Sequence, residues 1–511
     1  MIGRPGLPRL LSEPAGLRPS GRLDLAACLA VCALLLLQQA WAWETAGRWP
    51  LSGDSSLYAF QALHWWGEPD PLLLAHWPDK PPVYIWLQSL ALHLGRNTLA
   101  AARSINLAAT ALTGVVLVLW CVRLRGWPSA VLAIGFWSLN PLVLAWAPSG
   151  LTDPLMVLWG TAALWLAWEG RWFGAGLLLA LALFTRQAGL AYLAMLPVVV
   201  HARAQPDTPV DWKPLLFGFS AVAVPIQLWD LARWHAAPSF WTLGFDHYAP
   251  LGIVPPQDWW PRLAEWLPLI RELTGHWSGA VAMAALLIWG MFEHRSDGVR
   301  RRRWLGFWLL AAACGWLAIH VMLSFSIWLR YLLPLVPLLC MVLPCLLPRM
   351  VKPVSIQGLL LLLASSVVLF SEALYIPRAQ LQYLPTGPRT KELADLPEAV
   401  QRLQAAAPPG SVLLEREFSW HYLYLLYGDT ALNRHWFADA DHLVDLLHEL
   451  PPETPVFWVR ARRDEPETGR LLTRLAQGGV HAAVCLEIEE IILQELSTDP
   501  GRRCDLFSPR S

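Results

Sequence analysis

Six ionisable residues of this chain stand beside strongly apolar segments, in motifs from five separate parts of the sequence. They are Asp54 in GDSSLY, Asp79 and Lys80 in WPDKPPVY, Asp153 in SGLTDPLM, Arg186 in FTRQAG and Arg330 in SIWLRYLL. A carboxylate can accept the proton of an attacking hydroxyl, and Lys and Arg can stabilise negative charge on a departing phosphate. The set therefore predicts a group transfer in which a phosphate leaves.

The composition predicts that these residues lie in a polytopic membrane protein. The chain has 511 residues, of which 55% are hydrophobic, 15% are charged and 31 are Trp, and its mean hydropathy is +0.39. Such values lie outside the range of ordinary soluble domains. The formal net charge is zero, so nothing favours a nucleic-acid partner. Each charge at membrane depth costs about 2.5–3.5 kcal/mol on insertion scales, which is why we interpret the six residues as a functional site.

Apolar segments long enough to span a bilayer, about 20 residues each, recur about eleven times, which predicts an α-helical polytopic fold. We expect spans near 23–43, 98–122, 127–146, 153–169, 172–184, 188–202, 214–232, 277–293, 304–324, 331–348 and 354–375. The basic residues that flank these spans fall on one side, which the positive-inside rule makes cytoplasmic. This orientation places the amino terminus inside, and the site residues and the C-terminal segment outside.

The outward-facing segments divide the chain into two expected parts. Residues 1–375 form the expected transmembrane domain, with long external loops at 44–97 and 233–276, and residues 376–511 form the expected external domain. Both loops are too long to be simple connectors, and the helical spacing of aromatic residues in the first loop indicates helices in the membrane interface. In the tail, helix-like stretches alternate with short apolar runs, a pattern typical of a small α/β domain.

Two features of the sequence leave alternatives open. The first span follows a basic leader and ends in AWA at 40–42, so a cleavable signal peptide is the alternative to a retained helix. Six of the eight Cys lie in apolar runs and are interpreted as small core residues. Cys485 and Cys504 lie in the polar tail, where they can pair if the tail is exported.

Most of the charged residues also have a purely structural interpretation. Asp153 precedes Pro154 at the start of an apolar run, where a helix cap explains it. Lys80 can extend its ammonium group to lipid headgroups, and Arg186 and Arg330 can anchor helix ends. A carboxylate at the position of Asp54 gains nothing from the positive-inside rule, so we interpret Asp54 as the centre of the site.

A donor that reacts at a membrane surface can carry the transferred group on a lipid. Its tail would lie between helices while its phosphate stays at the interface near Lys80, Arg186 and Arg330. The sequence contains neither a glycine-rich nucleotide fingerprint nor a Walker motif, which agrees with a donor other than a soluble nucleotide. The residues therefore predict transfer of a sugar from a lipid phosphate.

The order of these motifs resembles that of the membrane-embedded C-type glycosyltransferases, particularly the lipid A aminoarabinose transferases and the protein mannosyltransferases that use polyprenyl-phosphate sugars. The resemblance covers residues 20–350, and its most specific motif is DKPP. It implies that Asp54 is the catalytic base and that Lys80, Arg186 and Arg330 bind the donor phosphate.

The same resemblance assigns the remaining site residues. Asp153 corresponds to a second catalytic acidic residue in the second external loop. Tyr58, Asp79 and Tyr331 correspond to residues that contact the substrate. No metal ligands are assigned and no cofactor is certain, although a divalent metal stays an open alternative.

The activity that the resemblance implies is an inverting transfer of a pentose or hexose. The donor is a polyprenyl-phosphate sugar, and the acceptor is a hydroxyl or phosphate of lipid A, another lipid, a glycan or a protein. The resemblance places the protein in the bacterial inner membrane, with the amino terminus in the cytoplasm and the C-terminal domain in the periplasm. It implies no nucleic-acid partner.

Three other functions remain open at this point. A transporter or flippase of lipid-linked sugars would also carry charges within the membrane, but these would line a path through the bilayer midplane. A ligase or polymerase of lipid-linked oligosaccharides would use a diphosphate-linked donor. A scaffold protein anchored in the membrane would not need about eleven spans.

Overall fold

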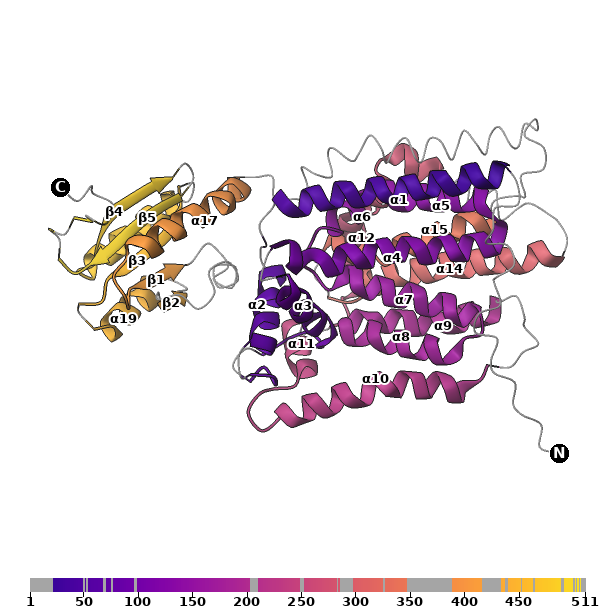
Figure 1. The fold of residues 1–511 in the computed structure, drawn as a ribbon, viewed down its shortest axis with the longest axis horizontal. Coiled ribbons are helices and arrows are strands. Elements are labelled where there is room, and N and C mark those ends of the chain that lie inside the picture. The colour runs from indigo at the N-terminus through magenta and orange to yellow at the C-terminus, as the bar shows by residue number, and fades with distance from the viewer. Residues whose placement is uncertain are drawn as a thin grey trace.

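The protein consists of a bundle of long helices and a smaller domain that contains a five-stranded sheet (Figure 1). The computed structural model describes residues 22–48, 51, 54–67, 70–74, 77–95, 99–202, 210–248, 252–282, 284, 297–324, 327–346, 388–415, 433–436, 440–451, 453–462, 465–488, 491–499, 501, 503–504 and 506. The predicted span at 354–375 and most of the one at 277–293 lie outside these residues.

The bundle is built from the apolar segments that the sequence predicts as spans. Its helices are α1 (Arg22–Arg48), α4 (Leu99–Arg125), α5 (Trp127–Leu139), α6 (Pro141–Trp146), α7 (Asp153–Trp168), α8 (Trp172–Thr185), α9 (Leu190–Ala202), α10 (Trp212–Arg233), α14 (Asp297–Met322) and α15 (Leu335–Leu346). Among the described residues, three helices are long and apolar enough to cross a membrane, within 24–44, 100–124 and 212–233, and shorter apolar helices accompany them. The total of eleven spans stays a prediction.

The predicted span at 127–146 is wrong as a single helix, because the chain breaks at Asn140. Asn140 is extended, with a ψ of 125°, and its side-chain oxygen accepts a hydrogen bond of 3.1 Å from the backbone N–H of Leu142 at the start of α6. Pro141 then occupies the first position of α6, where its missing N–H costs nothing. The Asn-Pro pair therefore ends one helix and caps the next.

Glycine lets two helices of the bundle pack closely. A Cβ atom on Gly176 of α8 would lie 1.9 Å from the carbonyl oxygen of Leu215 in α10. A Cβ atom on Gly218 of α10 would lie 2.1 Å from the carbonyl oxygen of Phe173 in α8. Small residues at such crossings allow backbones to approach closely inside a membrane.

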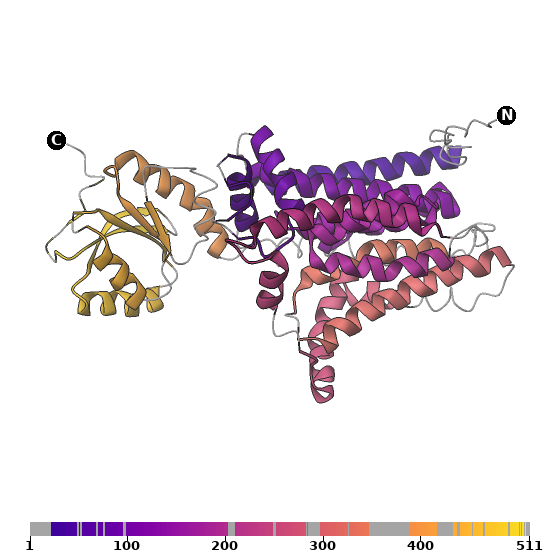
Figure 2. The same cartoon turned by 90° about the horizontal axis from the view of Figure 1, so that it is seen from below.

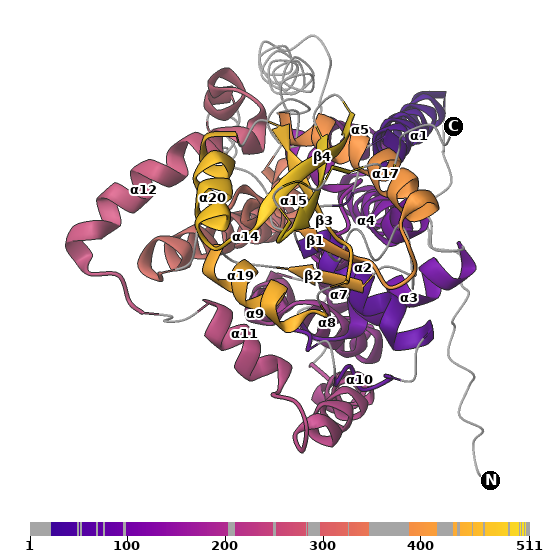
Figure 3. The ribbon, with the colours of Figure 1, turned by 90° about the vertical axis from the view of Figure 1, so that its left-hand side faces the viewer.

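Shorter elements lie at the end of the bundle that faces the sheet domain (Figures 1 and 2). They include α2 (Asp54–Gly67) and α3 (Val83–Leu94) from the first predicted loop, and α11 (Phe240–Tyr248), α12 (Pro256–Arg271) and η2 (Glu272–Thr274) from the second. The 3-10 turns η1 (Gln187–Gly189) and η3 (Leu329–Leu332) precede α9 and α15. Helices α2 and α3 bury most of their apolar residues, whereas α12 projects from the side of the bundle (Figure 3).

The C-terminal part is an α/β domain, as the alternation of patterns predicts. Its elements are α17 (Pro388–Ala406), β1 (Val412–Glu415), β2 (Asn433–Trp436), α19 (Ala440–Glu449), β3 (Val456–Ala461), α20 (Glu465–Gln477), β4 (His481–Ile488) and β5 (Ile491–Ser497). The strand order is β2-β1-β3-β5-β4; β1 pairs parallel with β2 and β3, and β5 pairs antiparallel with β3 and β4. The run HAAVCLEIEEIIL contains β4 and the first residues of β5, which pair antiparallel.

Helices cover both faces of this sheet. Leu413 and Phe457 pack in one hydrophobic cluster with residues of α17, whereas their neighbours Leu414 and Trp458 pack in another with residues of α19 and α20. Successive residues of a strand point to opposite faces, which explains the continuous apolar runs of β1 and β3.

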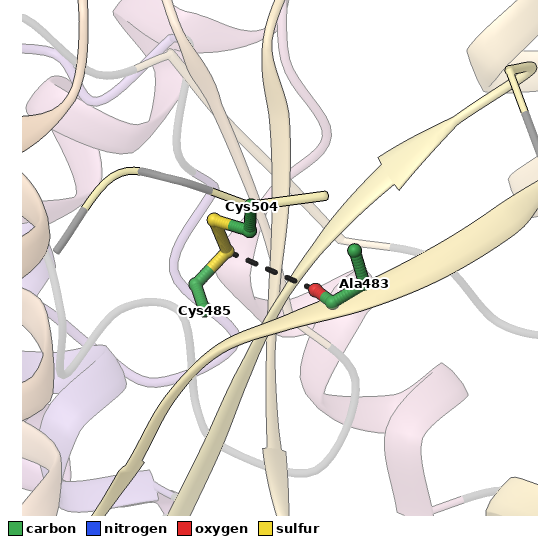
Figure 4. Close-up of a disulfide and its surroundings, with 3 residues drawn as sticks. All are labelled: Ala483, Cys485 and Cys504. Carbon is green, nitrogen blue, oxygen red and sulfur yellow. Dashed lines mark hydrogen bonds between the residues drawn. A yellow bond between two sulfur atoms is a disulfide. The ribbon is translucent and has the colours of Figure 1, made fainter. Parts of the chain in front are cut away.

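A disulfide joins the two cysteines of the tail. Cys485 of β4 is bonded to Cys504, 19 residues further along the chain (Figure 4). The bond ties the segment after β5 to the edge strand of the sheet. The pairing that the sequence leaves conditional on export is therefore present in the structure.

Candidate active site

The carboxylate of Asp54 and the guanidinium of Arg330 form an ion pair that joins distant parts of the chain. Asp54 is the first residue of α2 and Arg330 lies in η3, and the Arg330 Nη1 to Asp54 Oδ2 distance is 2.9 Å. The Asp54 side chain is 44% exposed and that of Arg330 is 15% exposed. The carboxylate is therefore reachable from outside the bundle while it stays bound to a largely buried cation.

The charges around Asp54 favour its ionised form. Burial alone would raise the pKa of the Asp54 carboxyl, whereas the charge and hydrogen bond of Arg330 lower it. The charges of Lys80 and Arg186 act in the same direction as Arg330, so the pKa lies below its ordinary value. Asp54 is thus a carboxylate at neutral pH.

A second ion pair lies deeper, between Asp153 at the start of α7 and Arg186 directly after α8. The side chains of Asp153 and Arg186 are 2% and 4% exposed. Asp153 occupies the first helical position, while Thr152 is the N-cap residue and makes no side-chain capping bond. The structure therefore favours pairing with Arg186 over capping as the main contact of this carboxylate.

A third pair is formed by the neighbours Asp79 and Lys80 in the turn before α3. The Lys80 side chain is 3% exposed and bonds to the Asp79 carboxylate, so it does not extend away from the protein. The amide of Gln187 donates a hydrogen bond of 3.1 Å to the backbone carbonyl of Asp79. This bond ties the turn to η1, next to Arg186.

The ring of Tyr331 lies near two of the cations. Its ring centroid is 5.2 Å from the guanidinium carbon of Arg186 and 5.9 Å from that of Arg330. A ring in this position attracts both guanidinium groups and holds them near one another. Tyr58, by contrast, is buried in α2, where its ring packs edge-on against Tyr84 at 5.9 Å.

An apolar cavity of about 750 Å³ opens beside these residues. Side chains of α8, α9, α11 and α14 form its walls, among them Leu190, Met195, Val198, Phe245 and Ile319. Its polar lining is provided by Arg186, Gln187, His320 and Tyr331. The cavity thus combines a long apolar wall with a basic end, as an amphiphilic anion requires.

The sequence analysis missed several residues of this cavity. Gln187 directly follows Arg186 in the TRQ motif, and this adjacency is the only feature of the sequence that points to a role for Gln187 in the site. His320 and Trp316 lie in the apolar run WLAIHV and look like ordinary core residues there. Their role depends on the arrangement of α14 and η3, which no local pattern reports.

Within the part of the chain that the structure describes, each of the three carboxylates of the site is paired with a cation. The one group of metal-type ligands found among the described residues is Cys485, Glu495 and Cys504, and both cysteines are in the disulfide.

The helical bundle and the appended sheet domain share their fold with two solved structures. Both are of ArnT from Cupriavidus metallidurans: the apo state has a TM-score of 0.63 at 14% identity, and the form bound to undecaprenyl phosphate has 0.62 at 13%. Each comparison covers 92% of this chain and 98% of that one. The fold implied by the sequence motifs is therefore confirmed.

The similarity of this chain to ArnT is found by comparing three-dimensional structures. No protein-family model matches the sequence, and no curated protein sequence matches it.

Proposed function

We propose that the protein is a glycosyltransferase of the bacterial inner membrane that transfers a sugar from a polyprenyl-phosphate donor to an acceptor hydroxyl or phosphate. The observation that carries this proposal is the apolar cavity that ends at Arg186 and Tyr331, beside the Asp54–Arg330 pair. A solved structure of the same fold, at 13% identity, binds undecaprenyl phosphate, which supports this class of donor.

The lipid part of the donor would occupy the cavity between α9 and α14. Walls made of Leu, Val, Ala and Trp side chains offer an isoprenoid chain no polar group to displace. The phosphate would then lie at the basic end, within reach of Arg186 and, beyond Tyr331, of Arg330. Lys80 supplies a third positive charge close enough to act on Asp54.

The reaction follows from the charges at this end. Asp54 accepts the proton of the acceptor hydroxyl as its oxygen attacks the anomeric carbon from the face opposite the phosphate. The bond between that carbon and the phosphate oxygen breaks, and the lipid phosphate leaves with the electron pair. Lys80, Arg186 and Arg330 stabilise the negative charge that grows on the leaving group. One displacement of this kind inverts the anomeric configuration.

The carboxylates of Asp79 and Asp153 have a positioning role in this account. Asp153 holds Arg186 in a buried ion pair, and Asp79 holds Lys80. Cations that are already oriented need not reorganise when charge develops, which is what gives electrostatic stabilisation its effect.

The orientation that we propose places the site and the sheet domain on the outer face of the membrane. The support is the distribution of basic flanking residues, together with the disulfide in the tail. We also propose a domain boundary at residue 375, with support from α17, the first element of the sheet domain among the described residues, which begins at Pro388.

The test of the donor class is transfer or slow hydrolysis of radiolabelled polyprenyl-phosphate monosaccharides by the purified protein. We expect turnover by the wild type and a loss of about 100-fold or more in Lys80→Ala. Lys213→Ala removes the same charge at an exposed position at the start of α10 and should leave turnover unchanged. Turnover of diphosphate-linked donors alone would contradict the proposal.

A further inference from the structure

One side chain of α12 holds the end of α14. Arg262 donates hydrogen bonds to the backbone carbonyls of His320, at 3.1 Å, Val321, at 3.2 Å, and Leu323, at 3.0 Å. The last carbonyls of a helix lack partners within it, and a cation there also interacts favourably with the helix dipole. Arg262 therefore fixes where, and in which direction, α14 ends.

Two further contacts reinforce this connection. The backbone N–H of Val254, just before α12, donates to the carbonyl of Met322 at 2.8 Å, and that of Ser324 donates to the carbonyl of Gly252 at 3.0 Å. The ring of Trp266, a fully buried residue of α12, packs edge-on against the ring of His320 at 5.6 Å. Helix α12 is thus attached to the end of α14 by several contacts, although most of its surface is exposed.

The last two turns of α14 in turn hold Tyr331. The indole N–H of Trp316 donates to the backbone carbonyl of Tyr331 at 2.8 Å, and the His320 ring lies 5.4 Å from the Tyr331 ring. His320 Nδ1 lies 2.9 Å from the carbonyl oxygen of Trp316. Because a carbonyl only accepts, Nδ1 carries the proton, which fixes the orientation of the imidazole.

We propose that Arg262 is a positioning residue for the lipid-phosphate site. By holding the end of α14 it holds Tyr331, whose ring lies 5.2 Å from the guanidinium carbon of Arg186 and 5.9 Å from that of Arg330, the two cations that would bind the phosphate. The residue acts at a distance, since the described residues that line the cavity do not include Arg262. The nature of the ligand in this inference rests on the proposed function.

The experiment measures binding of undecaprenyl phosphate to the full-length protein in lipid nanodiscs. We expect Arg262→Gln to weaken binding by about tenfold, and Arg262→Lys to weaken it less, because Lys keeps the charge but cannot bond to three carbonyls in a fixed plane. Arg271→Gln is the matched control. It removes the same charge from the same helix, where Arg271 pairs with the adjacent Glu272, and should leave binding unchanged.

Kinetics separate positioning from a general loss of structure. In Arg262→Gln the KM for the donor should rise by about tenfold, while kcat at saturating donor stays within about threefold. In a Tyr331→Ala background the same substitution should change the KM by less than about twofold, because the residue through which it acts is gone.

The outcomes discriminate between the inference and the proposed function. Unchanged binding in Arg262→Gln, or a fall in kcat with an unchanged KM, would overturn the inference alone. Failure of the wild type to bind any polyprenyl phosphate would overturn the proposed function and this inference with it. If Arg262→Gln does not fold, Arg262→Lys gives the same comparison with a smaller expected change.

Discussion

Arg330 forms an ion pair with Asp54, so the guanidinium that would bind the donor phosphate lies 2.9 Å from the carboxylate that would act as base. In the function that we propose, a bound phosphate would compete with Asp54 for this cation. Donor binding would then weaken the interaction that keeps Asp54 a poor base, in the complex where a base is needed.

The pH dependence of activity tests this relationship. Asp54 acts as a carboxylate and its pKa is lowered in the free protein, so activity should fall on acidification only below about pH 4, the ordinary range of an aspartic acid. In Arg330→Gln the positive charge that lowers the pKa of Asp54 is lost, so the acid limb of kcat/KM should move to higher pH. Arg123→Gln, which removes a charge paired with Glu169, should not move it. An acid limb at the same pH in wild type and Arg330→Gln would contradict the assignment.

Gly315 offers a steric test of the cavity. It lines the cavity on α14, and no atom lies within 4 Å of the position of a Cβ atom there. Gly315→Trp should fill the cavity and weaken binding of undecaprenyl phosphate by about tenfold or more, whereas Gly315→Ala should bind normally. Equal binding by both variants would show that the lipid lies elsewhere.

The close crossing of α8 and α10 predicts a stability effect. Gly176→Ala would place a methyl group against the carbonyl of Leu215, so the helices must separate. We expect a loss of about 2 kcal/mol or more, seen as a lower thermal midpoint in detergent. The same substitution at Gly315, which has open space around it, is the control. Equal midpoints in the two variants would mean that α8 and α10 are further apart than the structure shows.

The disulfide tests the orientation of the sheet domain. Disulfides form in exported compartments and are rare in the cytosol, so Cys485 and Cys504 should resist maleimide labelling in denatured cell extracts until a reductant is added. The variant Cys485→Ser should expose one reactive thiol at residue 504 without reduction. Two free thiols in the wild-type tail during growth would place this domain in the cytoplasm.

The charged residues that we assign to the site are conspicuous in the sequence because charges are costly at membrane depth. Asp54, Asp79, Lys80, Asp153, Arg186 and Arg330 were selected on this basis, and the structure joins them in three ion pairs at one end of the bundle. What the sequence could not provide is the pairing itself. The Asp54–Arg330 pair, for example, forms because the fold places η3 next to α2, although the two residues are 276 positions apart in the sequence.

One predicted span was wrong and two features were not predicted, and each has a physical explanation. Hydropathy treated residues 127–146 as one span and passed over the Asn140–Pro141 signal, which breaks the helix. Strand β2 has the sequence NRHW, which contains no apolar run, and it forms because β1 offers an edge for parallel pairing. The cavity arises from the separation of α9 and α14, a tertiary property.

The most direct measurement of the central claim is sugar transfer by Asp54→Asn from a radiolabelled polyprenyl-phosphate monosaccharide, with donor binding measured on the same preparation. Asp258→Asn, an equivalent change at an exposed residue of α12, is the control. The account predicts that transfer by Asp54→Asn falls by about 10²–10⁴-fold while donor binding persists. Transfer at the wild-type rate by a folded Asp54→Asn protein would contradict it.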